Sequence, residues 1–157
     1  MVRVAVVGIG GYGGGLIEAL QRMSEPLDCR LVAAADARLP ALAEQATALS
    51  KAGVELFDDA LRMLDALHGN CDAVYIASSI PTHAPLCIAA AGAGFHVHLE
   101  KPPAATVQEV DAMLTALDAA GRFCLVGFHA LHAADIRFIK EREIVGATPI
   151  FCSGVLT

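Results

Sequence analysis

Charged residues are scarce in this sequence: they make up 18% of its 157 residues, whereas hydrophobic residues make up 55%. A chain with so much apolar surface to bury is expected to fold, which argues against intrinsic disorder. Long apolar runs are also missing, since no stretch of about 18 apolar residues lacks a charge or a turn signal, so no transmembrane helix is predicted. The apolar residues come instead in short runs, typical of parallel strands that are covered on both faces.

Cysteine pairs and excess positive charge are absent too. The five cysteines form no CxxC motif and are odd in number, which favours reduced core thiols and a cytoplasmic protein over a disulfide framework. The N-terminus lacks a basic segment followed by a long apolar one, so no signal peptide is predicted. A net charge of −6 disfavours nucleic acid as a partner. We expect neither a nucleic-acid nor a membrane partner.

Strand and helix patterns alternate along the chain, which predicts parallel strands joined by right-handed crossovers. The predicted strands cover residues 3–7, 31–36, 54–57, 73–77, 96–99 and 123–127, and the helices cover residues 12–23, 40–51, 59–67, 82–93 and 107–120. This order predicts an α/β fold, a doubly wound parallel Rossmann sheet in the order 3-2-1-4-5-6 with helices on both faces. Residues 1–128 would form this dinucleotide-binding domain.

Several residues set the expected helix boundaries. Pro40 is expected to open the second helix, a position that proline favours, and Asp58 to cap the third. Thr106 and Glu109 match a capping box before the fifth helix. The apolar positions that mark the fifth helix are Val107, Val110, Leu114 and Leu117.

A glycine-rich loop, Gly8-Ile9-Gly10-Gly11-Tyr12-Gly13, matches the pattern G-x-G-x-x-G between the first strand and the first helix. Gly8 permits the tight turn, Gly10 lets a pyrophosphate approach the backbone, and Gly13 lets the helix pack close to the strand. Backbone N–H groups at the helix start then bind the negative charge. A merely tight turn is the alternative, but the flanking strand and helix favour a dinucleotide site that includes Gly11 and Tyr12.

Asp36 ends the second predicted strand, 23 residues after Gly13. An acid at this place accepts hydrogen bonds from the adenosine ribose and repels a 2′-phosphate, which favours NAD over NADP. Arg38 leaves NADP possible, because a guanidinium binds a 2′-phosphate or stacks on adenine. The alternative for Asp36 is a simple strand-end acid.

The second half of the chain carries a more specific pattern. Ser78-Ser79-Ile80-Pro81-Thr82-His83 follows the fourth strand, and His96-Val97-His98-Leu99-Glu100-Lys101-Pro102 spans the fifth. Together with the glycine loop and Val126-Gly127-Phe128, these segments resemble the Gfo/Idh/MocA oxidoreductase family, from Val4 to Phe151. Ser78 and Ser79 stand where the family usually has Thr-Pro, and Ile80 where Asn is frequent.

The resemblance implies an NAD(P)-dependent oxidoreductase that transfers a hydride between the nicotinamide and a hydroxyl or carbonyl carbon of a small sugar- or polyol-like substrate. It implies that Lys101 is catalytic, because the family's lysine lies beside the nicotinamide and orients or deprotonates the substrate hydroxyl. Further cofactor-site residues implied by the resemblance are Ser78, His83, Glu100, Lys101 and His129. His83 is expected mainly to brace the loop after the fourth strand. The full-length protein is expected to form a homo-oligomer.

His96 and His98 share one face of a predicted strand, as two metal ligands would. No acid or cysteine at ligand spacing completes a zinc site, so both are interpreted as packing residues and no metal is expected.

Residues 129–157 are expected to hold a helix over 130–143 and a strand over 149–156. By the resemblance, these are a connecting helix and the first strand of an otherwise absent substrate domain.

Two other functions fit a Rossmann pattern. One is a dinucleotide-binding or redox-sensing module without catalysis. The other is a methyltransferase that uses S-adenosylmethionine, against which the Glu100-Lys101-Pro102 segment argues.

Overall fold

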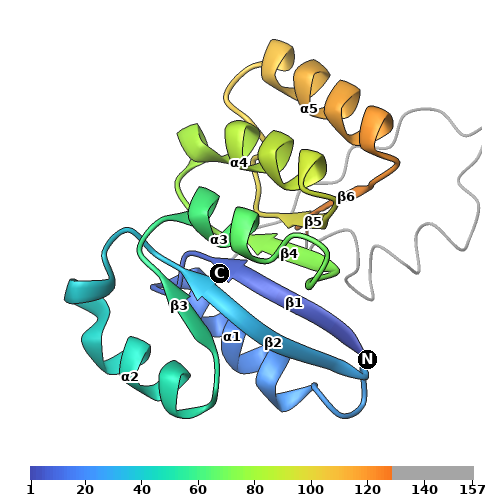
Figure 1. The fold of residues 1–157 in the computed structure, drawn as a ribbon. Helices are drawn as coiled ribbons and strands as arrows, with labels where there is room; N and C mark the ends of the chain where they lie inside the picture. Colours follow the sequence, from blue (N-terminus) through green and yellow to red (C-terminus); the bar gives the residue numbers. More distant parts are fainter. Residues whose placement is uncertain (129–157) are drawn as a thin grey trace, which may run out of the picture. The chain divides into compact units, whose positions relative to one another are not determined.

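The computed structural model describes residues 1–128 (Figure 1). The predictions for residues 129–157, including His129 and the last helix and strand, lie outside the described residues. Residues 1–127 form one compact unit. In chain order its elements are β1 (Val2–Val7), α1 (Tyr12–Arg22), β2 (Cys29–Ala35), the 3-10 turn η1 (Leu39–Leu42), α2 (Ala43–Lys51), β3 (Glu55–Phe57), α3 (Ala60–Ala66), β4 (Ala73–Ile76), α4 (Ile80–Gly92), β5 (His96–Leu99), α5 (Val107–Ala120) and β6 (Cys124–Val126).

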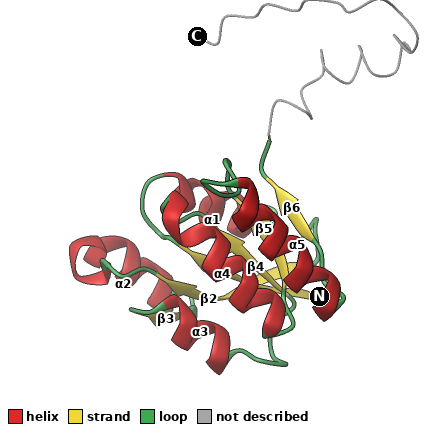
Figure 2. Ribbon diagram, turned by 90° about the horizontal axis from the view of Figure 1, so that it is seen from above, coloured by secondary structure: helices red, strands yellow, loops and turns green. Residues whose placement is uncertain are grey.

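The strands form one parallel sheet in the order β3-β2-β1-β4-β5-β6, which confirms the predicted order. β3 and β6 lie at its two edges (Figure 2). The chain crosses from one side of β1 to the other between β3 and β4. In doubly wound folds, ligands bind at such a switch point, outside the carboxyl ends of the strands.

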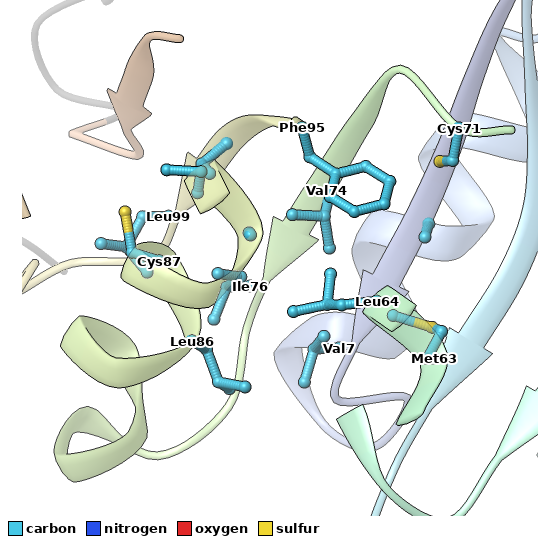
Figure 3. Packing of buried hydrophobic residues seen from close by; sticks show 14 of the residues in the cluster. Val7, Met63, Leu64, Cys71, Val74, Ile76, Leu86, Cys87, Phe95 and Leu99 are labelled. Atoms are coloured by element: carbon cyan, nitrogen blue, oxygen red, sulfur yellow. The ribbon is translucent and has the colours of Figure 1, made fainter. Parts of the chain in front are cut away.

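Helices cover both faces of the sheet, as predicted, and each face has its own core. Successive strand residues point to opposite faces. Val4 and Val6 of β1 join the core under α1 and α2, whereas Ala5 and Val7 join the core under α3, α4 and α5. Residues of this second core, shown in Figure 3, include Met63, Leu64, Val74, Ile76, Phe95 and Leu99. Burial on both faces explains why the strands are continuously apolar.

Three of the cysteines, Cys29, Cys71 and Cys87, are buried in these cores as free thiols. They fill positions that small apolar residues commonly take. The predicted role as core residues is confirmed for these three.

Two helices begin elsewhere than predicted. Pro40 lies in the 3-10 turn η1, and the α-helix starts only at Ala43. The fourth helix starts at Ile80 rather than at Thr82. Pro81 is tolerated in its first turn because the N–H groups there have no intrahelical partner to lose.

The cap of α3 was also predicted wrongly. Asp59, not Asp58, accepts the N–H of Arg62 at 2.9 Å and caps the helix. Asp58 instead pairs with the Arg62 guanidinium at 3.3 Å. Either acid fits the capping pattern, and the backbone conformation at Asp59 decides between them.

The capping box before α5 is confirmed, since Thr106 and Glu109 exchange both hydrogen bonds. The apolar face of this helix is narrower than its pattern indicates. Leu117 is buried together with Met113, whereas Val107 and Leu114 are exposed. The contact of α5 with α4 decides which stripe is covered.

Candidate cofactor site

A cavity of about 800 Å³ opens at the carboxyl ends of β1, β2 and β4, at the switch point of the sheet. Its walls come from the glycine loop, the segment after β2, and the first residues of α3 and α4. Of the predicted site residues, those that line the cavity are Gly8, Gly10, Asp36, Arg38 and Ser78. The volume lies within the range of ordinary ligand and cofactor sites.

Two glycines of the loop are required by the protein's own packing. Gly8 has a φ of 91°, and a Cβ there would lie 2.7 Å from the carbonyl oxygen of Ala77. A Cβ on Gly13 would collide with the carbonyl of Gly8. The predicted tight turn and close approach of helix to strand are therefore both present.

Gly10 behaves differently. A Cβ there would make only ordinary contacts, at 3.4 Å, with the Arg38 guanidinium and the Leu42 side chain. The fold itself therefore accepts a Cβ at position 10, and Gly10 lines the cavity, where its bare backbone forms a cradle for a ligand. Among the described residues, no side chain caps α1, which begins after Gly11. The first N–H groups of α1 therefore have no capping side chain, and such groups commonly bind anions. This loop thus fits a pyrophosphate.

Asp36 is buried, and both of its carboxylate oxygens are engaged. Oδ2 accepts the backbone N–H of Ile9 at 3.1 Å, and Oδ1 accepts that of Arg38 at 2.9 Å. The Arg38 side chain is 71% exposed, and its Nε lies 3.5 Å from Oδ1. Asp36 thus orders the loop and presents negative charge to the cavity, while Arg38 remains accessible from solvent.

His83 ties together the segments that follow β4 and β5. It is only 1% exposed, its Nε2 lies 3.0 Å from the carbonyl oxygen of Ser78, and its Nδ1 lies 2.9 Å from that of Pro102. The Ser78 hydroxyl also bonds to that of Thr82 at 2.7 Å. His83 therefore braces the loop, and it does not line the cavity. The geometry agrees with the expected bracing role, and a contact of His83 with a cofactor stays a prediction.

Glu100 and Lys101 follow β5. Glu100 is 7% exposed, and its Oε2 accepts the backbone N–H of Lys101 at 3.3 Å. The Lys101–Pro102 peptide is cis, and the Lys101 side chain is exposed. Neither residue lines the 800 Å³ cavity. They stand beyond it at the same edge of the sheet, where β5 ends next to β4.

Tyr12 and Gly11 stand at the start of α1 and are exposed to solvent. Partial desolvation raises the pKa of Tyr12, and the charge of Glu100 adds to this effect. The phenol is therefore protonated at neutral pH. The Tyr12 side chain also interacts electrostatically with the carboxylate of Glu100, which follows β5.

The two strand histidines pack against aromatic rings. His98 stacks on Tyr75 with 4.5 Å between ring centroids, and His96 stacks on Phe123 at 4.2 Å. Within residues 1–128, no group of three or more His, Cys, Asp or Glu side chains is placed to hold a metal ion.

Sequence reasoning missed two parts of the site. Asp58, Asp59 and Leu61 line the cavity. A signal was present, because β3 lies beside β2 and the residues after both strands must meet at one edge. Gly127 follows β6, and a Cβ there would lie 2.8 Å from Glu100 Oε1. No local pattern marks that contact.

A sequence profile described as "Oxidoreductase family, NAD-binding Rossmann fold", that of the Gfo/Idh/MocA family, matches residues 2–128. Among curated relatives, a myo-inositol 2-dehydrogenase of Thermotoga maritima is 31% identical over 141 residues, which are 89% of this chain and 40% of the relative. A D-glucoside 3-dehydrogenase of Escherichia coli is 30% identical over 147 residues, which are 92% and 40%. The chain spans about 40% of the length of these relatives.

Solved structures give the same result. A probable dehydrogenase from Thermotoga maritima is 30% identical with a TM-score of 0.77, covering 89% of this chain and 40% of that one. The WlbA dehydrogenase from Bordetella pertussis, in complex with NADH and UDP-GlcNAcA, is 28% identical with a TM-score of 0.78, covering 89% and 41%. An oxidoreductase profile over the whole domain argues against the methyltransferase alternative. The chain belongs to the Gfo/Idh/MocA oxidoreductase family, and its residues 2–128 are the family's NAD-binding Rossmann domain.

Proposed function

We propose that this chain is the cofactor-binding part of an NAD(P)-dependent dehydrogenase that acts on a hydroxyl or carbonyl carbon of a sugar- or polyol-like substrate. The observation that carries the proposal is the cradle at Gly10, where backbone without a side chain lines the cavity at the switch point of the sheet. The names of the relatives, an inositol and a glucoside dehydrogenase, support the substrate class.

We assign each half of the dinucleotide a place at this edge of the sheet. Asp36 stands at the end of β2 and accepts the ribose hydroxyls of the adenosine half. The N–H groups at the start of α1 hold the pyrophosphate. Ser78, Glu100 and Lys101, which follow the neighbouring strands β4 and β5, would then lie near the nicotinamide half.

Bound NAD supplies a hydride acceptor. We propose that Lys101 handles the proton: in its neutral amine form, Nζ would accept the proton of the substrate hydroxyl, and the hydride from the same carbon would go to the bound NAD, which leaves a carbonyl. In the reverse direction, Nζ returns the proton to the carbonyl oxygen. The exposed position of Lys101 allows the proton to pass to water.

We propose a small-molecule substrate, a homo-oligomeric full-length protein and a cytoplasmic location, the last supported by the free thiols. Over residues 1–128, none of the helices has the length and apolar character needed to cross a membrane.

Calorimetry of the chain against NAD, NADP and S-adenosylmethionine tests the cofactor half of the proposal. We expect NAD to bind most tightly and S-adenosylmethionine not to bind. For catalysis, Lys101→Ala in an active preparation should lower kcat with little change in NAD affinity. We expect almost no turnover of polyols or sugars by residues 1–157 alone, because hydride transfer needs a substrate held in a near-attack pose and the chain spans only about 40% of the length of the related dehydrogenases. Binding of NAD without turnover in any longer form would favour a non-catalytic module.

A further inference from the structure

Gly127 occupies a position where glycine is needed for space rather than for backbone conformation. Its φ is outside the left-handed region, and its N–H continues the ladder to β5 by donating to Leu99 O at 2.9 Å. A Cβ at this residue would lie 2.8 Å from Glu100 Oε1 and 3.3 Å from His98 Nε2. The first distance is shorter than a Cβ contact tolerates, so a methyl group and the Glu100 carboxylate compete for one space.

The residues around Gly127 leave little room for both an added methyl group and the Glu100 carboxylate. Glu100 is 7% exposed, and its other oxygen accepts the N–H of Lys101. His98 is held by its stack on Tyr75, with interplanar angle 18°. The backbone of β6 is held by its pairing with β5. The carboxylate is the far end of a side chain, whereas the strand backbone is held by its pairing, so we expect a methyl at position 127 to displace the carboxylate and not the strand.

Displacement of the Glu100 carboxylate would also affect the backbone of Lys101. The hydrogen bond from the Lys101 N–H to Glu100 Oε2 joins the carboxylate to the backbone that presents the Lys101 side chain. This backbone lies at the carboxyl end of β5, on the nicotinamide side of the switch point. A change at β6 therefore reaches the nicotinamide half of the site without touching the glycine loop or Asp36.

We propose that Gly127 is a positioning residue: its missing side chain is the space that holds the Glu100 carboxylate and, through it, the Lys101 backbone beside the nicotinamide. The proposal rests on the proposed function, because it needs the nicotinamide to lie at the end of β5.

The test compares NAD with ADP-ribose, which lacks the nicotinamide, by calorimetry on the intact chain. The Kd of ADP-ribose divided by the Kd of NAD reports the nicotinamide contacts alone. We expect Gly127→Ala to lower this ratio by about tenfold, the effect of losing one charge-assisted hydrogen bond. NAD affinity should fall, while ADP-ribose affinity stays near that of the unmodified chain. Gly92→Ala is the matched control, because a Cβ there meets nothing within 4 Å.

A second pair of variants isolates the clash. Glu100→Ala removes the carboxylate, and in that background Gly127→Ala should change neither the ratio nor the unfolding temperature further. If Gly127→Ala alone does not fold, folding of the double variant would still identify Glu100 as the group that Gly127 accommodates, and the Glu100→Ala ratio would report the nicotinamide contact.

The outcomes separate the two proposals. If the unmodified chain does not bind NAD, the proposed function fails. If it binds NAD but Gly127→Ala leaves the ratio unchanged, or weakens NAD and ADP-ribose equally, the positioning role of Gly127 is wrong while the proposed function stands. Further loss on adding Gly127→Ala to Glu100→Ala would also overturn it.

Discussion

The carboxylate of Asp36 accepts a hydrogen bond from the backbone N–H of Ile9, with 3.1 Å between the two atoms. The acid after β2 is thereby joined to the glycine loop after β1, although 27 residues separate the two in sequence. Asp36 therefore orders the loop, and in the proposed function the same side chain also carries the charge that recognises the adenosine ribose. Substitutions at Asp36 must be designed to separate these purposes.

Asp36→Asn is expected to narrow the preference for NAD over NADP by about tenfold or more, because the charge that repels a 2′-phosphate is lost. The amide oxygen of Asn can still accept the N–H of Ile9, whereas its amide nitrogen cannot accept that of Arg38, so the unfolding temperature should fall by less than in Asp36→Ala. Asp36→Ala should narrow the preference similarly and destabilise the chain by about 1–3 kcal/mol, since buried N–H groups lose their acceptor. Titration calorimetry and thermal unfolding distinguish the two variants. Equal affinities of the unmodified chain for NAD and NADP would contradict the role of Asp36.

Gly10→Val is expected to abolish dinucleotide binding, by at least about a hundredfold, while the fold is retained. The reason is that the new side chain fills the cradle for the pyrophosphate, whereas its Cβ meets its own protein only at 3.4 Å. Gly15→Ala in the following helix, α1, is the control, because a Cβ there meets nothing within 4 Å. Unchanged NAD affinity of Gly10→Val in a fluorescence titration would mean that the loop serves only as a turn.

Gly13→Ala tests the close contact between α1 and β1. The added Cβ collides with the Gly8 carbonyl, so we expect a loss of about 1–3 kcal/mol in the free energy of unfolding. Gly15→Ala should instead stabilise the chain by about 0.5–1 kcal/mol, since alanine favours helix. Urea unfolding monitored by circular dichroism measures both. Equal stability of the two variants would show that the helix approaches the strand less closely than described.

The pair of Arg3 and Asp72 predicts a pH dependence. Arg3 donates through its backbone N–H at 2.7 Å and its guanidinium at 3.0 Å, and these bonds hold the pKa of Asp72 at about 2, below the ordinary 3.8. Because the folded-state pKa is lowered, the stabilisation is present above about pH 4 and is lost as the pH falls toward 2. The side chains are 40% and 41% exposed, so solvent screening limits its size to about 1 kcal/mol or less.

Asp72→Asn should therefore destabilise the chain at neutral pH, and the difference from the unmodified chain should close between about pH 4 and pH 2. Urea unfolding across this pH range is the measurement. Asp58→Asn is the control, because its pair with Arg62 is mostly exposed and should contribute almost nothing. A difference that is independent of pH would assign the loss at Asp72 to packing.

Local patterns predicted most of the fold. Short apolar runs, glycines after strands and the Thr106–Glu109 capping box each involve residues close together in sequence, and the alternation of elements then restricts the topology to few choices. The wrong prediction for the cap of α3 has a similar cause. Asp58 and Asp59 offer equivalent local signals for the cap of α3, and only the backbone conformation at Asp59 distinguishes them.

The glycine loop and the acid after β2 could be predicted from residue type and spacing within one βαβ unit, and the strand order followed from the alternation of elements. The contacts that join the units could not be predicted in this way. His83 bridges the segments after β4 and β5, Asp36 bonds to the loop after β1, and Gly127 faces Glu100 from the next strand. Each contact joins residues at least 19 positions apart or from different strands, where side-chain direction depends on how the strands pair and twist. Parallel pairing brings the ends of all the strands to one edge, and that edge is where the cofactor site forms.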